Sequence, residues 1–84
     1  MMSYQVLVSK KVAKQIEKIP DPDYTRIKKS ILDLGINPRP AGCKKLEGRE
    51  GYRIRQGNYR IIYDIQERIK IVAILDVGNR KEIY

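Results

Sequence analysis

The feature that most constrains this 84-residue chain is a two-residue turn, Gly57-Asn58, between two short runs of alternating residues. Glycine at the first central position suits a type II′ turn, whose twist matches that of a β-hairpin. A two-residue loop also fixes the strand register. We therefore expect five facing pairs, which are Gln56 with Tyr59, Arg55 with Arg60, Ile54 with Ile61, Arg53 with Ile62, and Tyr52 with Tyr63.

Side chains alternate between the two faces of a strand, so this register separates a basic face from an apolar one. The basic face carries Arg53, Arg55 and Arg60. Like charges directly opposite each other destabilise a sheet, so this face indicates a site kept for an anion, and the planar fork of arginine suits phosphate. The apolar face, which we expect to be core, carries Tyr52, Ile54, Tyr59, Ile61, Tyr63 and Ile65.

Two amphipathic helices are predicted before the hairpin. A β-rich strand over 4–8 precedes Ser9, which suits the N-cap of a helix over 10–19 that Pro20 ends. Asp21 and Pro22 then suit the N-cap and first position of a second helix, with Gly35 as its C-cap. The apolar residues at helical spacing are Val12, Ala13, Ile16 and Ile19, then Tyr24, Ile27, Ile31 and Leu34. These helices form an antiparallel pair that needs a sheet face to cover.

The remaining strands complete a two-layer α+β domain over 1–84. Lys44-Lys45-Leu46 is expected as a short edge strand, and an almost continuously apolar strand covers 69–76. A three-residue loop over 66–68 would set Asp64 opposite Lys70, a favourable charge pair. That register points Ile69, Ile71, Ala73 and Leu75 toward the helices. It leaves Val72 and Ile74 on the arginine face, either as a filled central strand or as a surface that a partner covers.

Composition limits the chemistry that this chain can carry. The net charge of +8, from 18 basic and 10 acidic residues, favours nucleic acid or an acidic protein as partner, although it can also serve solubility. Histidine is absent and cysteine occurs once, which excludes His/Cys zinc sites and an internal disulfide. We expect no metal and no cofactor. The single cysteine, and the lack of a membrane-length apolar run or a signal peptide, predict a cytoplasmic protein.

Four segments together resemble the RelE toxin family, within the RelE/ParE superfamily of bacterial and archaeal toxin–antitoxin pairs. They are Lys45-Leu46-Glu47-Gly48, Tyr52-Arg53-Ile54-Arg55, Gly57-Asn58-Tyr59-Arg60-Ile61-Ile62-Tyr63 and Val77-Gly78-Asn79-Arg80-Lys81-Glu82-Ile83-Tyr84. The resemblance covers essentially the whole chain. It implies the family's microbial RNase-like fold, with an N-terminal strand, a helical hairpin and then an antiparallel sheet of three to four further strands.

The resemblance also implies an activity, a ribosome-dependent endoribonuclease that cuts mRNA in the A site and inhibits translation. No metal is needed, because the substrate 2′-hydroxyl attacks the adjacent phosphate. Of the matching positions, Arg60 would stabilise the phosphoryl oxygens, Arg80 would orient the phosphate and Tyr84 would take the proton. Lys81 or water would return a proton to the leaving oxygen. The expected phosphate and RNA contacts are Arg53, Arg55, Lys44, Lys45 and Lys81.

The implied partners are the ribosome with its mRNA and a cognate antitoxin, with operator DNA reached only through the antitoxin. We expect acidic antitoxin residues near the arginine face and apolar ones over Val72 and Ile74. Two alternatives stay open, a ParE-like inhibitor of DNA gyrase and a catalytically weakened relative that only binds its antitoxin and DNA. The set of Arg60, Arg80 and Tyr84 favours the nuclease. Relatives often carry lysine at the first two basic positions, where this chain has arginine, and this keeps the weakened relative possible.

Overall fold

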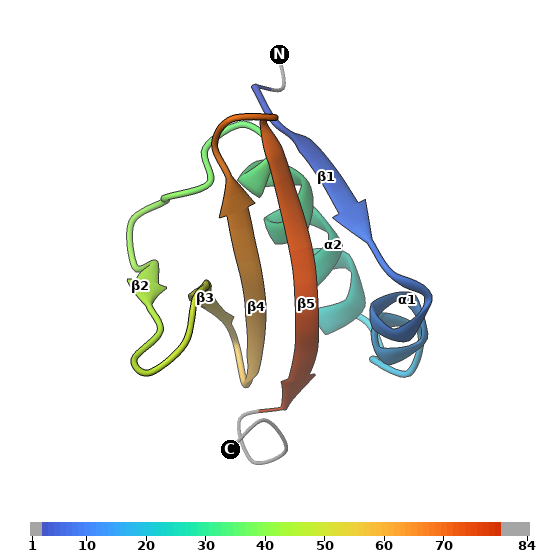
Figure 1. Cartoon of the computed structure of the whole chain (residues 1–84). Helices are drawn as coiled ribbons and strands as arrows, with labels where there is room; N and C mark the ends of the chain where they lie inside the picture. Colours follow the sequence, from blue (N-terminus) through green and yellow to red (C-terminus); the bar gives the residue numbers. More distant parts are fainter. Residues whose placement is uncertain (1–2, 80–84) are drawn as a thin grey trace.

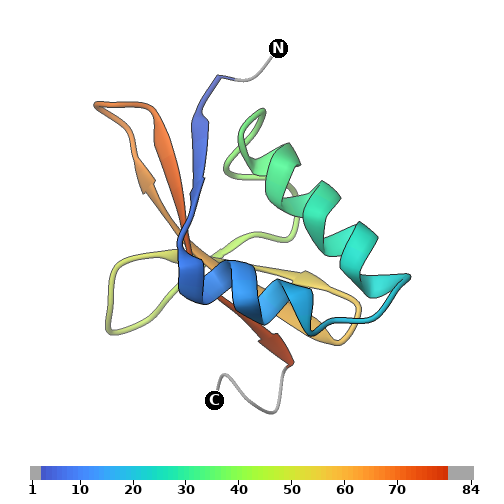
Figure 2. The ribbon, with the colours of Figure 1, turned by 90° about the vertical axis from the view of Figure 1, so that its right-hand side faces the viewer.

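The computed structural model describes residues 3–79. Its elements, in chain order, are β1 (Gln5–Val8), α1 (Lys10–Glu17), α2 (Asp23–Leu34), β2 (Lys44–Lys45), β3 (Tyr52–Gln56), β4 (Tyr59–Gln66) and β5 (Ile71–Asn79). The strands form one sheet in the order β1-β5-β4-β3-β2 (Figure 1). Only the β1–β5 pair among these strands is parallel. The helices cover one side of the sheet (Figure 2), which confirms the two-layer α+β architecture.

The predicted hairpin is confirmed in full. All five facing pairs of β3 and β4 occur in the expected register. Gly57 has a φ of 61°, the left-handed backbone that a glycine adopts at little cost. The expected edge strand forms over Lys44 and Lys45 and does not include Leu46. In it, Lys44 pairs with Arg53 of β3. The short loop therefore fixes which side chains share the arginine face.

Both helices form, with small differences at their ends. The Ser9 hydroxyl accepts a hydrogen bond from the backbone N–H of Val12 at 3.2 Å, which confirms the N-cap of α1. Helix α2 begins at Asp23 and not at Pro22, yet the Asp21 carboxylate still accepts from the backbone N–H of Thr25 at 3.2 Å. Neither helix is long and apolar enough to cross a membrane, as holds for any helix within residues 3–79.

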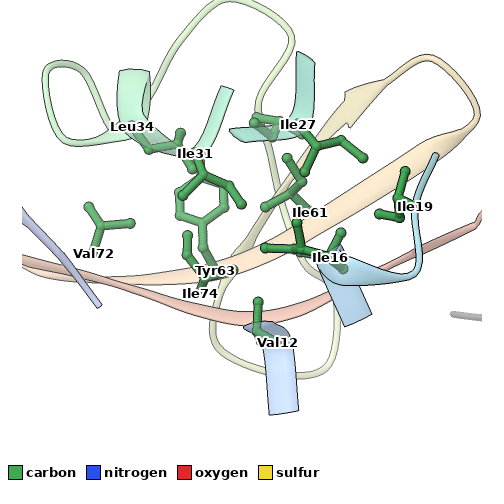
Figure 3. Close-up of a cluster of buried hydrophobic side chains, with 12 residues drawn as sticks. Val12, Ile16, Ile19, Ile27, Ile31, Leu34, Ile61, Tyr63, Val72 and Ile74 are labelled. Atoms are coloured by element: carbon green, nitrogen blue, oxygen red, sulfur yellow. The ribbon is translucent and has the colours of Figure 1, made fainter. Parts of the chain in front are cut away.

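The core lies between the helices and the inner face of the sheet (Figure 3). Its side chains come from α1, the segment after α1, α2, β3, β4 and β5. This burial stabilises two helices that are too short to be stable alone. Tyr63 is fully buried, and Tyr52 and Tyr59 pack against the cluster at its margin. The buried members are Val12, Ile16, Ile19, Ile27, Ile31, Leu34, Ile54, Ile61, Tyr63, Val72, Ile74 and Val77.

The predicted face of the last strand is wrong. Val72 and Ile74 are 0% and 3% exposed and lie in the core, whereas Ile69 and Leu75 are exposed. The turn before β5 is one residue longer than expected, so Asp64 pairs with Ala73 and not with Lys70. This shift of an odd number of residues moves every side chain to the opposite face.

An irregularity in β5 then reverses the alternation once more. Ile62 pairs with Asp76 while its neighbour Tyr63 pairs with Ile74, so Leu75 is the extra residue of a bulge. Val77 therefore joins Val72 and Ile74 on the helix side, although its number differs from theirs by an odd count. The bulge leaves Asp76 in the same cross-strand row as Ile62, on the arginine face.

Polar contacts connect three segments at the end of the sheet where the β4–β5 turn lies. Glu67, in the turn between β4 and β5, accepts a hydrogen bond from the Tyr4 hydroxyl at 2.7 Å and forms an ion pair with Arg39. The Tyr4 hydrogen bond, followed by the Arg39 interaction, lowers the pKa of Glu67. These contacts join the segment before β1, the linker after α2 and the β4–β5 turn.

Candidate functional site

The basic face of the hairpin lies opposite the core. By register, Arg55 and Arg60 share one cross-strand row, and Arg53 shares the next row with Ile62. Arg55 is exposed and Arg53 is half-buried, but Arg60 is only 6% exposed. A nearly buried guanidinium is costly to desolvate, so its place in the middle of the sheet marks a specialised position.

Two hollows open on this part of the sheet. The larger, about 440 Å³, is lined by Lys44, Lys45, Leu46, Glu47, Arg49, Arg53, Ile62 and Asp76. The smaller, about 250 Å³, is lined by Ala41, Gly42, Lys44, Arg53, Ile54 and Arg55. Lys44 and Arg53 line both hollows, and the two hollows together are called the basic trough below. Such a trough can hold an extended polyanion through several phosphate contacts at once.

The structure brings together four of the five expected phosphate contacts, which are Arg53, Arg55, Lys44 and Lys45. Arg60 lies on the same face. Within residues 3–79 no group of three His, Cys, Asp or Glu side chains is placed to hold a metal ion. Fixed cations on this part of the face can orient an anionic ligand and stabilise its charge.

The sequence interpretation missed one acidic residue of this face. Asp76 lines the larger hollow from β5, and its side chain is held by α1. The Gln15 amide donates to Asp76 Oδ1 at 2.7 Å and accepts from the backbone N–H of Val77 at 3.0 Å. One sequence signal points to Asp76, since it is the only charged residue between Ile71 and Val77.

Comparisons with known proteins identify the family of this chain. The sequence profile of the family described as ParE toxin of type II toxin-antitoxin system, parDE, matches residues 6–84. The chain belongs to the RelE/ParE family of toxins. The curated protein RelE1 of Methanocaldococcus jannaschii, a candidate toxin by its name, is 30% identical over 87 residues, which cover 99% of this chain and 97% of that protein.

Solved structures of this family share the fold. A chain of the archaeal RelE-RelB complex from Pyrococcus horikoshii superposes with a TM-score of 0.85 at 32% identity, over 96% of this chain and 99% of that chain. A chain of the RelB-RelE antitoxin-toxin complex from Methanococcus jannaschii gives 0.75 at 30% identity, over 93% and 94%. The resemblance drawn from the four sequence segments is thus confirmed.

Three residues expected at the family's site fall outside the described part of the chain. They are Arg80, Lys81 and Tyr84, whereas the description ends at Asn79 of β5. The Tyr59–Asn79 pair closes the antiparallel ladder beside the Arg60–Gly78 pair. Strand β5 therefore ends next to Arg60.

In this RelE/ParE-family chain, an apolar groove lies between α1, α2 and the end of β1. It has a volume of about 270 Å³ and is lined by Val8, Ala13, Ile16, Glu17, Tyr24, Lys28, Ile31 and Leu32. Leu32 is 54% exposed and Val8 is also exposed. The exposed apolar surface of the described chain thus includes this helical groove, and Val72 and Ile74 do not contribute to it.

Proposed function

We propose that this chain is the toxin of a type II toxin–antitoxin pair and acts as a ribosome-dependent mRNA endoribonuclease that inhibits translation. The observation that carries the proposal is the position of Arg60, a nearly buried cation directly opposite Arg55, which lines the basic trough. Burying a guanidinium costs free energy. A fixed cation of this kind can stabilise the negative charge that develops in a transition state.

The proposed reaction needs no metal. The ribose 2′-oxygen attacks the adjacent phosphorus, the bond from phosphorus to the 5′-oxygen breaks, and the products carry a 2′,3′-cyclic phosphate and a 5′-hydroxyl. Arg60 stabilises the non-bridging oxygens, and Arg53 and Arg55 clamp neighbouring phosphates. By family position, Arg80 orients the phosphate and Tyr84 takes the 2′-hydroxyl proton.

The other expected residues fit around this reaction. Lys44 and Lys45, at the edge of the sheet, would contact the RNA backbone of mRNA or of the ribosome. Lys81 is assigned by family position to an RNA contact, and Lys81 or water would supply the proton for the 5′-oxygen. The hollows are open at the surface and would not bend a free strand into line, so the ribosome would supply that alignment. Such a function places the protein in the cytoplasm.

A cognate antitoxin is the proposed protein partner, since two of the structural relatives come from toxin–antitoxin complexes. Acidic antitoxin residues would meet the arginine face. Val72 and Ile74 are buried in the core and are not accessible to an antitoxin. The apolar antitoxin residues would instead contact the helical groove. The apolar lining of that groove, with Glu17 and Lys28 among its residues, suits an amphipathic segment. Operator DNA would be reached only through the antitoxin.

A second candidate function is inhibition of DNA gyrase. The matching family profile carries a ParE description, and this favours a gyrase inhibitor more than the fold alone does. Arginine at positions 53 and 55, where RelE relatives often have lysine, also keeps open a catalytically weakened relative that binds only antitoxin and DNA. Neither alternative requires Arg60 to contact a reacting phosphate.

A cell-free translation reaction separates these functions. The chain is added at increasing concentration, mRNA ends are mapped by primer extension, and supercoiling by gyrase is assayed in parallel. The endoribonuclease predicts new mRNA ends inside ribosome-bound codons and unchanged supercoiling. Loss of supercoiling with intact mRNA would establish the gyrase inhibitor, and no effect in either assay would indicate the weakened relative.

A further inference from the structure

One carboxylate stands in an unusual place on the basic face. Ile62 pairs with Arg53 on one side and with Asp76 on the other, so the three residues form one cross-strand row. Arg53 and Asp76 are thus two strand spacings apart, about 10 Å. The Asp76 side chain is 33% exposed and lines the larger hollow together with Arg53. A phosphate is repelled by a carboxylate, so a nucleic-acid group that meets Asp76 must be a hydrogen-bond donor.

The orientation of this carboxylate is built into the fold. The backbone N–H of Val77 can only donate, so the Gln15 carbonyl oxygen must face it, and the Gln15 amide nitrogen must face Asp76 Oδ1. This two-ended contact occupies Oδ1. Asp76 Oδ2 has a longer contact with Lys11 Nζ, at 3.9 Å, and Lys11 is itself well exposed. Oδ2 therefore has remaining capacity to accept a hydrogen bond.

We propose that Asp76 reads the ribose of bound RNA, its Oδ2 accepting a hydrogen bond from a 2′-hydroxyl of the strand whose phosphates Arg53 and Arg60 bind. The 2′-hydroxyl is the group by which a protein tells RNA from DNA. Gln15 is the positioning residue that holds the carboxylate. This inference rests on the proposed function in one respect, that the ligand of the basic face is RNA.

The hollow contains a second acid that serves as a matched comparison. Glu47 also lines it, but from the exposed loop that follows β2. Removal of either carboxylate deletes one negative charge from the same basic surface, and both changes raise the general electrostatic attraction for any nucleic acid. Only removal of Asp76 should also abolish discrimination at the 2′ position.

The test measures binding and needs no ribosome. Fluorescence anisotropy at low salt compares three single-stranded oligomers of the same sequence, made as RNA, 2′-O-methyl RNA and DNA. The wild-type chain should prefer RNA over the other two by on the order of ten-fold, the size expected for one hydrogen bond to a charged acceptor. In Asp76→Ala the preference should fall to about one, while affinity for DNA stays equal or increases. Gln15→Met should give a partial fall.

Several results would overturn the inference. These are equal binding of all three oligomers by the wild type, an unchanged preference in Asp76→Ala, or an equal loss in the Glu47→Ala control. A binding preference that depends on base identity and not on 2′-O-methylation would assign the hydrogen-bond donor to a base. This result would also overturn the inference. If Asp76→Ala does not fold, as judged by circular dichroism, an unchanged preference in Gln15→Met decides against the inference. If the Asp76 inference fails in this binding test, the proposed mRNA cleavage is not affected. If mRNA cleavage is not observed, the ratio of RNA to DNA binding can still be measured.

Discussion

Arg60 on β4 lies directly opposite Arg55 on β3, and of the two only Arg60 is buried. Two facing cations weaken a sheet, so this pair, the second from the Gly57-Asn58 turn, costs stability. The proposed function explains the arrangement, since a cation that is fixed before the reaction stabilises developing negative charge without reorganising.

Replacement of Arg60 by methionine, which keeps much of the side-chain volume, should remove most of the activity. Loss of one preorganised donor typically lowers a rate about 10²–10³-fold. The melting temperature should stay the same or rise slightly, because the repulsion with Arg55 is relieved. Both quantities are measured on the same preparation, by cleavage in translation extracts and by thermal unfolding. A large fall in melting temperature would make Arg60 a structural residue.

The sequence was sufficient where local chemistry fixes the geometry. The loop Gly57-Asn58 determined every pair of the hairpin, and Ser9 determined the start of α1. It was insufficient for β5, whose residues are almost all apolar and carry no alternation to distinguish one register from another. The longer turn before β5 and the bulge at Leu75 determine which side chains of β5 point toward the helices. The contact between Gln15 and Asp76 joins residues 61 positions apart, and no local pattern predicts it.

Tyr63 should contribute to stability through its hydroxyl as well as its ring. The hydroxyl donates to the carbonyl oxygen of Pro38 at 2.6 Å inside the core. Tyr63→Phe leaves that carbonyl without this donor, which should cost about 1–3 kcal/mol. For a domain of this size, 1 kcal/mol corresponds to roughly 4–8 °C in melting temperature. An unchanged melting temperature would mean that water replaces the hydroxyl.

We expect the burial of Tyr63 to cause a loss of stability at alkaline pH. Burial raises the pKa of Tyr63 above its ordinary value of 10.0. The folded state therefore favours the neutral phenol, and this contribution is complete below pH 10 and is lost as the pH rises above it. Thermal unfolding of wild type and Tyr63→Phe between pH 8 and roughly pH 11 should show a steeper decline for the wild type. Parallel curves would contradict this role of Tyr63.

The contacts of Glu67 should make the protein lose stability as the pH falls into the acid range. Its hydrogen bond from Tyr4 and its ion pair with Arg39 lower its pKa below the ordinary value of 4.5. A lowered folded pKa adds stability above pH 4.5 that disappears as the pH falls through the folded value. Glu67→Gln should therefore melt below the wild type at neutral pH, and the two curves should converge as the pH falls below 4.5. A constant difference across this range would rule out titration of Glu67 as the cause.

The helical groove gives a prediction for the antitoxin. Leu32 is exposed beside the groove between α1 and α2, and its replacement by glutamate adds repulsion against an acidic apolar segment. Leu32→Glu should lower affinity for the cognate antitoxin at least ten-fold without a change in folding, measured by calorimetry. The control is Ile69→Glu, an equally exposed apolar position in the β4–β5 turn. Equal effects of both substitutions would show that the groove is not the contact.

The most direct test of the central claim is the chemistry of the cut ends on ribosomes stalled at a known codon. Ribosome complexes with a defined A-site codon are incubated with wild type or Arg60→Met, and the RNA fragments are sequenced with end-group analysis. The account predicts cuts inside the A-site codon that leave a 2′,3′-cyclic phosphate and a 5′-hydroxyl, with a rate at least about 100-fold lower for the variant. Uncut mRNA with the wild type, or equal cutting by both proteins, would contradict it.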